Sequence, residues 1–296
     1  VSRRPAYSRH RGNLRTDVAI VGGGAIGCAT AYVFAAAGID VALFEQGRIA
    51  QHQAHRSTGV VMHEPEPDFH RLVAQHGVRD ARHLYQTSRR GSLEYVAALR
   101  RLRIECGLQL RDALHVSSTP EGIRRLEREY SARRDAGLDV AAAKGSALFR
   151  QTGTNGFGLV SHGNASVDPY KATLGLARAA AARGAQLFEQ SPVRRIRSQR
   201  RTVEIRTEGG VVTASKVVIA SGYPTDDFKP LRRRFARCDG YVVLTPELPA
   251  GVRREMTPDG LILRDTASPD HWLHWIGNRV LFSGADQASL PERARE

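Results

Sequence analysis

The apolar and polar positions near the start of the chain follow a strand, helix, strand order. Residues 17–21 form a short apolar run rich in β-branched side chains, which is typical of a buried parallel strand. An alanine-rich stretch over residues 25–37 predicts a helix, and Gly38 is placed to end it in the left-handed conformation. Residues 40–44 form a second apolar run and predict a neighbouring strand. Together these elements predict a βαβ unit.

Three glycines occupy the turn between the first predicted strand and its helix. Gly22 allows a tight turn, Gly24 lets a pyrophosphate lie against bare backbone, and Gly27 lets the helix pack closely on the strand. Glu45, at the end of the second strand, can accept hydrogen bonds from a ribose diol and would repel a 2′-phosphate. The alternative is a glycine-rich turn that binds nothing. The pattern favours a cofactor with an ADP-containing half: FAD and NAD both fit, and NADP fits poorly.

The middle of the chain alternates between helical and strand patterns. Apolar positions recur at helical spacing over residues 70–106, and Asp68 precedes them as a plausible N-cap. Residues 110–117 predict a strand, and a helix with a charged face follows over residues 119–136. A second alanine-rich helix is expected over residues 168–183, with an aspartate at its N-cap and a proline at its first position.

The last third of the chain is richer in strand patterns. A hairpin is expected over residues 202–214, and residues 216–222 predict a buried strand that ends in small residues. Beyond Tyr223, short alternating runs predict an antiparallel sheet separate from the parallel strands, at residues 241–245, 261–264, 271–275 and 280–283.

Composition narrows the class of protein. The 296 residues suffice for one large or two modest domains, and no apolar run approaches the ~20 residues that cross a bilayer. Three cysteines are too few for a disulfide framework or a metal knuckle. The histidines and acids of residues 63–70 lack standard ligand spacing, so we expect no metal. We expect a cytoplasmic protein with a disordered basic tail over residues 1–16.

The formal net charge of +14 comes from 44 lysines and arginines against 30 acids. A basic surface is one requirement for binding nucleic acid. The arginine clusters, however, fall at predicted loop and strand edges without interleaved aromatic residues. A solvated arginine-rich surface is therefore the favoured interpretation, and nucleic-acid binding is the lesser alternative.

Several segments in order resemble the FAD-dependent oxidoreductases of the D-amino-acid oxidase family, which includes glycine, sarcosine and γ-glutamylputrescine oxidases. The resemblance covers nearly the whole chain from Asp17 onward. It rests on residues 21–27 with Glu45, on residues 56–61, on residues 167–170, on residues 217–223 and on residues 271–286.

The resemblance implies an α/β fold with FAD as the cofactor. It implies a glutathione-reductase-like Rossmann FAD-binding domain and an interleaved α+β substrate domain that carries an antiparallel sheet. The expected FAD-binding domain comprises residues 17–108 and 166–225, and the expected substrate domain comprises residues 109–165 and 226–296.

The resemblance also implies cofactor-binding residues. The pyrophosphate and the adenosine ribose would be held by Gly22, Gly24, Ala25, Ile26, Gly27, Glu45 and Gln46. Near the phosphates and the flavin would lie Arg56, Ser57, Thr58 and Gly59. The backbone of Val193 would meet the adenine, and Ser221 and Gly222 would pass close to the nucleotide.

The implied reaction is oxidation of the carbon–nitrogen bond of an amine or amino acid by hydride transfer to flavin. Trp272 and His274 are the candidate residues of the substrate pocket. Where relatives commonly read Tyr-Leu-Arg-Trp, this chain reads Trp-Leu-His-Trp over residues 272–275. A histidine at the arginine's position lacks the bidentate fork that binds a carboxylate. The substrate itself, the electron acceptor and the oligomeric state are open.

Besides the histidine at residue 274, the chain departs from the family pattern in its length. Relatives continue beyond the segment that ends at Asp286, so we expect this chain to lack their C-terminal portion. Two alternatives to an active oxidoreductase therefore stay open. One is a truncated nucleotide-binding fragment without turnover, and the other is an NAD-dependent dehydrogenase.

Overall fold

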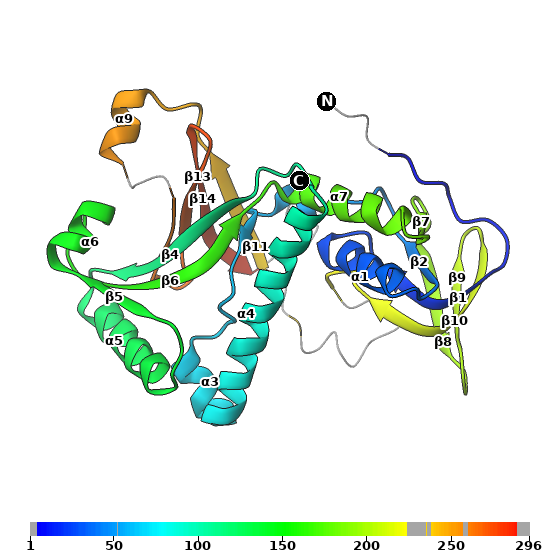
Figure 1. Ribbon diagram of the computed structural model, residues 1–296, viewed down its shortest axis with the longest axis horizontal. Coiled ribbons are helices and arrows are strands. Elements are labelled where there is room, and N and C mark those ends of the chain that lie inside the picture. The colour runs from blue at the N-terminus through cyan, green and yellow to red at the C-terminus, as the bar shows by residue number, and fades with distance from the viewer. Residues whose placement is uncertain (1–4, 52, 224–234, 236–237, 257–259, 289–296) are drawn as a thin grey trace. The chain divides into compact units, whose positions relative to one another are not determined.

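The computed structural model describes residues 5–51, 53–223, 235, 238–256 and 260–288 (Figure 1). The chain divides into two compact units, each built from three stretches of sequence. Unit 1 comprises Val1–Gly59, Ala98–Gly107 and Asp168–Ala236, and unit 2 comprises Val60–Ala97, Leu108–Val167 and Arg237–Glu296.

Unit 1 contains a six-stranded sheet whose middle strands are parallel. The strand order is β7 (Gln186–Phe188), β2 (Val41–Phe44), β1 (Leu14–Val21), β10 (Gly210–Ile219), β9 (Val203–Thr207) and β8 (Val193–Ser198). The first four strands are mutually parallel, and β9 and β8 add an antiparallel edge. Val21 pairs with Phe44 on one side and with Ile219 on the other, so the carboxyl ends of β2, β1 and β10 are level.

Among the described residues, the helices that begin in unit 1 are α1 (Ala25–Ala36), α2 (Gln53–Arg56) and α7 (Pro169–Ala181). The helices α1 and α7 lie side by side (Figure 1). Small residues allow this approach, because Cys28, Ala31 and Ala177 are all fully buried. The predicted ends are confirmed: Gly38 has a φ of +76°, and the Asp168 side chain accepts the Lys171 N–H at 3.0 Å.

The N-terminal segment, residues 5–13, is ordered against unit 1, whereas the sequence led us to expect a disordered tail. The N–H of Gly12 donates to the Gly209 carbonyl at 2.8 Å, and the N–H of His10 donates to Ser191 Oγ at 2.9 Å. The His10 ring packs edge-on against Phe44 and Phe188, whose rings are stacked on each other. An arginine-rich composition does not predict this packing, because the segment is held by the burial of a single ring, that of His10, and the charges around it stay exposed.

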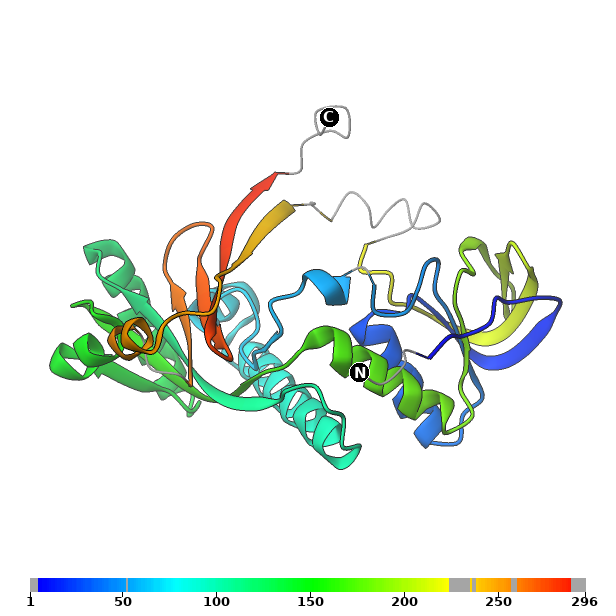
Figure 2. The same cartoon turned by 90° about the horizontal axis from the view of Figure 1, so that it is seen from above.

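Unit 2 is built on an eight-stranded sheet. Seven strands follow the order β11 (Cys238–Leu244), β14 (Arg279–Ala288), β13 (Trp272–Ile276), β12 (Leu261–Asp265), β4 (Gln109–Ser117), β6 (Phe157–Ser166) and β3 (Val60–Val61), and β5 (Ala141–Lys144) also pairs with β6. Figure 2 shows β11 and β14 as a long antiparallel pair. The expected antiparallel sheet is present, and among the described strands of this sheet only β12 and β4 pair in parallel.

The helices that begin in unit 2 are α3 (Phe69–His76), α4 (Val78–Arg101), α5 (Pro120–Asp135), α6 (Gly145–Thr152) and α9 (Ala250–Glu255). The division differs from the expected domain bounds, since residues 60–97 lie in unit 2. They lie there because β3 pairs with β6 and α3 packs against α5. Helical periodicity alone does not specify which sheet a helix covers.

The N-terminus of α3 is capped from a distance. Asp68 holds the N-cap position as expected, but its side chain makes no capping bond and pairs with Arg125 at 2.7 Å. The carboxylate of Glu129 accepts the N–H groups of Phe69 and His70 instead, at 2.8 and 2.9 Å. The cap therefore comes from α5, 60 residues later in the sequence than Phe69.

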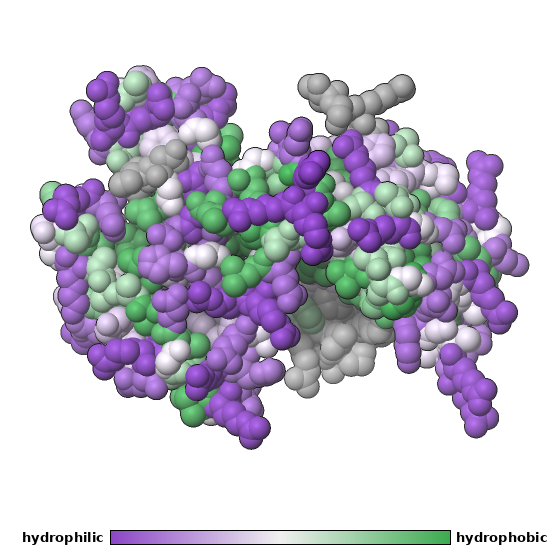
Figure 3. Space-filling view, viewed as in Figure 1, coloured by the Kyte–Doolittle hydropathy of each residue, from purple (hydrophilic) through white to green (hydrophobic). Residues whose placement is uncertain are grey.

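Hydrophilic side chains cover much of the visible surface (Figure 3). Within the described part of the chain, none of the helices combines the length and the apolar character needed to cross a membrane. The cytoplasmic location stays a prediction.

Candidate functional site

The glycine turn at the carboxyl end of β1 is packed so tightly that two of its glycines cannot be replaced. A Cβ on Gly22 would lie 2.5 Å from the Ala220 carbonyl oxygen, and Gly22 has a φ of +114°. A Cβ on Gly27 would collide with the Gly22 carbonyl oxygen. Gly24 differs from both, because a Cβ there would meet nothing within 4 Å. The turn therefore presents open space at Gly24, as a bound pyrophosphate requires.

The N-terminus of α1 opens at this turn without a side-chain cap. Gly24 is the N-cap residue, and the first helical hydrogen bond runs from the Cys28 N–H to the Gly24 carbonyl at 3.0 Å. The helix's own carbonyls do not reach the N–H groups of Ala25, Ile26 and Gly27. No acidic residue occupies this first turn. Backbone N–H groups and the helix dipole together favour an anion at this place.

The Glu45 carboxylate is fixed against the same turn. It is 7% exposed and accepts the Gly23 N–H at 2.7 Å and the Gly47 N–H at 2.8 Å. Burial and, second, the charge of Glu45 raise the pKa of the Cys28 thiol to about 12. Each carboxylate oxygen keeps a further lone pair. A ribose diol is a suitable donor for those positions.

The end of β10 completes this edge of the sheet. The Ala220 N–H donates to the Val21 carbonyl at 2.8 Å, which sets Ser221 and Gly222 directly after the contact with the glycine turn. Both residues are exposed, and Gly222 has a φ of +76°. The structure thus brings these two predicted residues to the edge that carries Gly22.

Val193 and Gln46 lie beside Glu45. The Ser191 N–H donates to the Glu45 carbonyl at 2.8 Å, and Val193 follows two residues later as the first residue of β8. Gln46 is exposed. Both residues are therefore close to the Glu45 backbone, although their part in binding stays a prediction.

The segment after α2 belongs to unit 1 as well. Arg56 and Ser57 are exposed, Thr58 is half-buried, and the buried Gly59 donates its N–H to Ser57 Oγ at 3.2 Å. This bond gives the segment its own turn. Its placement near phosphates and flavin stays a prediction.

The candidate pocket residues Trp272 and His274 share one face of β13 in unit 2. The Arg264 guanidinium lies over the Trp272 ring, 4.8 Å from its centroid, and Arg264 pairs with Asp270 and Glu66. His274 is 1% exposed, and its Nδ1 donates to the Trp275 carbonyl at 3.3 Å. Trp272 is thus the more accessible of the two, and the substrate-pocket role of both stays a prediction.

Sequence reasoning missed Arg111, which reaches the same carbonyl. Arg111 is 4% exposed in β4 and donates from Nη2 to the Trp275 oxygen at 3.2 Å. Its Nε donates to Ser166 Oγ at 2.9 Å. A guanidinium therefore lies next to the His274 imidazole. The available signal was an arginine in a run that otherwise predicts a half-buried strand.

One group of potential metal ligands is held together by arginines. Donor atoms of Asp68, His70 and Glu129 lie within 4.8 Å of one another. Burial alone would raise the pKa of Glu129, but Arg133 and the donors of His70 hold that pKa below its usual value. Arg125 pairs with Asp68 in the same way. These carboxylates already have cationic partners, which indicates a structural network.

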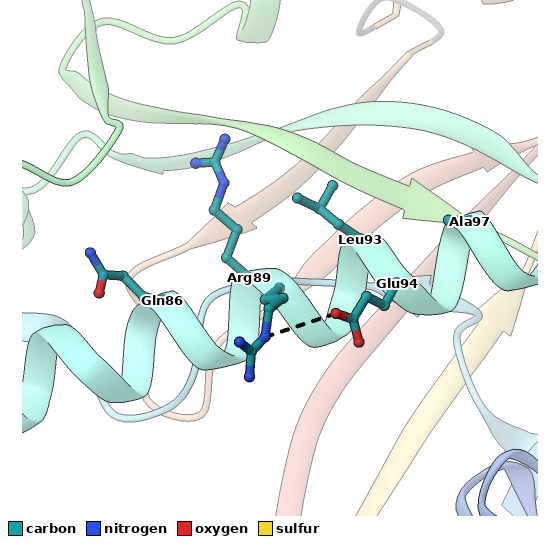
Figure 4. A pocket seen from close by; sticks show the side chains of 6 residues that line it. Gln86, Arg89, Leu93, Glu94 and Ala97 are labelled. Carbon is teal, nitrogen blue, oxygen red and sulfur yellow. Dashed lines mark ion pairs between the residues drawn. The ribbon is translucent and has the colours of Figure 1, made fainter. Parts of the chain in front are cut away.

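A surface hollow of about 420 Å³ lies elsewhere, on α4. It is lined by Gln86, Arg89, Arg90, Leu93, Glu94 and Ala97, and Figure 4 shows that these side chains come from one helix. The ion pair between Arg90 and Glu94, at 3.9 Å, lies within this lining. Of the residues that the structure describes, only those of α4 line the hollow, so the glycine turn of unit 1 is the better candidate for a cofactor site.

Comparison with known proteins gives a consistent result. The family model described as FAD dependent oxidoreductase matches residues 17–295. The gamma-glutamylputrescine oxidoreductase of Escherichia coli (strain K12) is 27% identical over 282 residues, which are 92% of this chain and 65% of that protein. The glycine oxidase of Geobacillus kaustophilus (strain HTA426) is 31% identical over 217 residues, which are 70% of this chain and 55% of that protein.

A solved structure agrees with the fold. The crystal structure of glycine oxidase from Geobacillus kaustophilus matches with a TM-score of 0.70 at 23% identity, over 94% of this chain and 73% of that chain. The chain spans 65% and 55% of the lengths of the two curated relatives, which is less than two thirds of either.

Proposed function

Because this chain belongs to the FAD-dependent oxidoreductase family DAO, we propose that it binds FAD at the glycine turn of unit 1 and oxidises a carbon–nitrogen bond. The family resemblance read from the sequence is confirmed, and so is FAD in preference to NAD. The proposed substrate is a small amine or amino acid, as the names of the two curated relatives suggest.

One observation carries the proposal: an open anion site and a buried acid share the carboxyl edge of the sheet. The N–H groups of Ala25 and Ile26 are free of helical partners, and Gly24 leaves room for a ligand. Glu45 is held beside them by the Gly23 N–H. These residues would hold the pyrophosphate and the ribose, respectively.

Bound FAD supplies the hydride acceptor of the reaction. The chain's own contribution is binding and orientation. We assign Trp272 to the wall of the substrate pocket because it is the half-buried member of its strand face. His274 and Arg111 are almost fully buried, so they would support Trp272 from within unit 2 and would not line the pocket themselves. No general base is assigned.

The test is FAD uptake by the purified chain. After incubation with FAD and desalting, the wild-type chain should show resolved flavin absorption bands. Anaerobic addition of candidate amines should then bleach those bands. A Gly24→Val variant should lose the flavin bands yet keep its thermal unfolding midpoint, because its extended backbone accepts valine and its Cβ faces open space.

Gly91→Ala is the matched control, since a Cβ at Gly91 in α4 also meets nothing within 4 Å. It should bind FAD like the wild type. A folded wild-type chain that takes up no FAD would contradict the proposal. FAD uptake without bleaching by any amine would favour the second candidate, a nucleotide-binding fragment without turnover.

A further inference from the structure

The N-terminal segment, residues 5–13, packs as part of unit 1, although it precedes the residues that the family model matches. Figure 1 shows its described part in dark blue, ahead of β1. The Glu189 N–H donates to the Ser8 carbonyl at 3.2 Å, and Arg9 Nε donates to Gln190 Oε1 at 2.7 Å. With the Gly12 bond described above, the segment is attached to the rest of unit 1 at its middle and near its C-terminal end.

The fit requires close backbone contact. A Cβ on Gly209 would collide with the His10 carbonyl oxygen, and a Cβ on Gly210 would collide with the Gly12 carbonyl oxygen. His10 itself is 3% exposed, and its Nδ1 lies 2.7 Å from Thr207 Oγ1. Unit 1 is therefore shaped to receive this segment, and the segment fixes where Tyr7 and Pro5 lie.

Residues 5–7 arrive at the carboxyl edge of the parallel strands. Arg48 follows β2, and Glu189 and Gln190 follow β7, which is parallel to β2. A hollow of about 270 Å³ opens between these loops and the N-terminal segment. Its lining consists of Pro5, Ala6, Tyr7, Arg48, Glu189 and Gln190.

The loops that line the hollow also carry the ribose-binding carboxylate. The Ser191 N–H donates to the Glu45 carbonyl, and the Gln190 N–H donates to the Gly47 carbonyl at 2.7 Å. The Ile49 N–H donates to Glu189 Oε1 at 2.8 Å. The hollow and Glu45 are thus neighbouring parts of one rigid edge.

We propose that the N-terminal segment walls the adenosine end of the cofactor site, with Tyr7 and Arg48 as its base-contacting side chains. An aromatic ring and a planar guanidinium are the groups on which nucleobases stack. The ligand class is the adenosine part of a dinucleotide or of free ADP. This inference rests on the proposed function for its ligand, and ADP binding tests it separately from flavin chemistry.

The experiment is calorimetric titration of the full chain with ADP and with FAD. Tyr7→Ala should weaken both ligands about tenfold, because both contain the same adenosine. Tyr7→Phe, which keeps the ring, should stay within about twofold of the wild type. Phe149→Ala, which removes an exposed aromatic side chain from α6 of unit 2, is the matched control and should change neither affinity.

Arg48→Ala provides a second variant, since Arg48 is exposed and its loss leaves the core intact. It should weaken ADP severalfold. Unchanged ADP affinity in both Tyr7→Ala and Arg48→Ala would overturn the inference, and so would a wild-type chain that binds no ADP. A chain that binds ADP through Tyr7 but takes up no FAD would support the inference while contradicting the proposed function.

Discussion

The carboxylate of Glu45 accepts the backbone N–H of Gly23 at 2.7 Å, which joins the acidic end of β2 to the glycine turn after β1. Its other oxygen accepts the Gly47 N–H. The residue that would bind the ribose therefore also holds the protein's own backbone in place. Binding and local stability are coupled at this side chain.

Glu45→Gln separates the two roles. Glutamine keeps one acceptor oxygen, so one backbone bond survives while the charge and the second acceptor are lost. Hydrogen bonds to charged groups contribute about 1.5–3 kcal/mol, so FAD affinity should fall at least tenfold and the unfolding free energy should fall by about 1–2 kcal/mol. Titration with FAD and urea denaturation measure the two effects. Unchanged affinity would remove Glu45 from the cofactor site.

Gly27→Ala should destabilise the apo chain strongly. The new Cβ collides with the Gly22 carbonyl oxygen, so α1 must move away from β1. Overpacking of this kind costs about 1–3 kcal/mol or more. Gly24→Ala is the matched control, because its Cβ enters open space and the apo chain should keep its stability. Equal urea midpoints for the two variants would contradict this account of the turn.

His115 should make unit 2 less stable in mild acid. Burial, followed by the charges of Arg264 and Arg125, lowers the pKa of His115 from 6.5 to about 4, against the opposing charges of Asp68 and Glu64. The Nε2–H donates to the Asp265 carbonyl at 2.9 Å. Between pH 6.5 and about pH 4, His115 is protonated in the unfolded chain and neutral in the folded chain. The free energy of unfolding therefore falls as the pH decreases through this range.

The full effect for His115 is about 3 kcal/mol by the free energy of one pKa unit. His115→Gln can still donate to the Asp265 carbonyl but cannot titrate. Urea denaturation at a series of pH values should therefore show a smaller decrease for the variant than for the wild type. Parallel pH profiles would show that the ring is not held neutral.

Arg133→Ala should destabilise unit 2 through an unpaired buried charge. Arg133 is 3% exposed and pairs with Glu129 at 2.5 Å and with Glu64. Removing one partner of such a pair costs about 3–5 kcal/mol. Its chain neighbour offers a control: Arg134 pairs with Asp135 at the surface, and Arg134→Ala should cost less than about 1 kcal/mol. Similar losses for both variants would contradict a structural role for the network.

Features that depend on neighbouring residues were predictable. Strand, glycine turn, helix and acidic terminus lie within about 30 residues of one another in such a unit, so the places of Gly22, Gly24, Gly27 and Glu45 in the fold could be assigned before any coordinates. Their contacts with FAD stay a prediction. The helix caps at Asp168 and Gly38 follow from local chemistry in the same way. The resemblance to the family extended these assignments to Ser221 and Val193.

Features that depend on pairing between distant segments were not predictable. The capping of α3 by Glu129 joins residues 60 positions apart, and the approach of Arg111 to Trp275 joins residues 164 positions apart. Strand β3 reads as a short apolar run whichever sheet it joins, and only its pairing with β6 assigns residues 60–97 to unit 2.

The sequence by itself determined the glycine turn between β1 and α1, because backbone sterics and one carboxylate define it locally. Only the tertiary structure showed that the N-terminal segment is ordered. Its arginines, read from the sequence, resemble those of a solvated tail. Only the folded sheet brings together Phe44 and Phe188, the stacked rings against which His10 is buried. Whether a side chain is buried depends on the residues that pack around it in the fold, and those residues lie outside the sequence of residues 5–13.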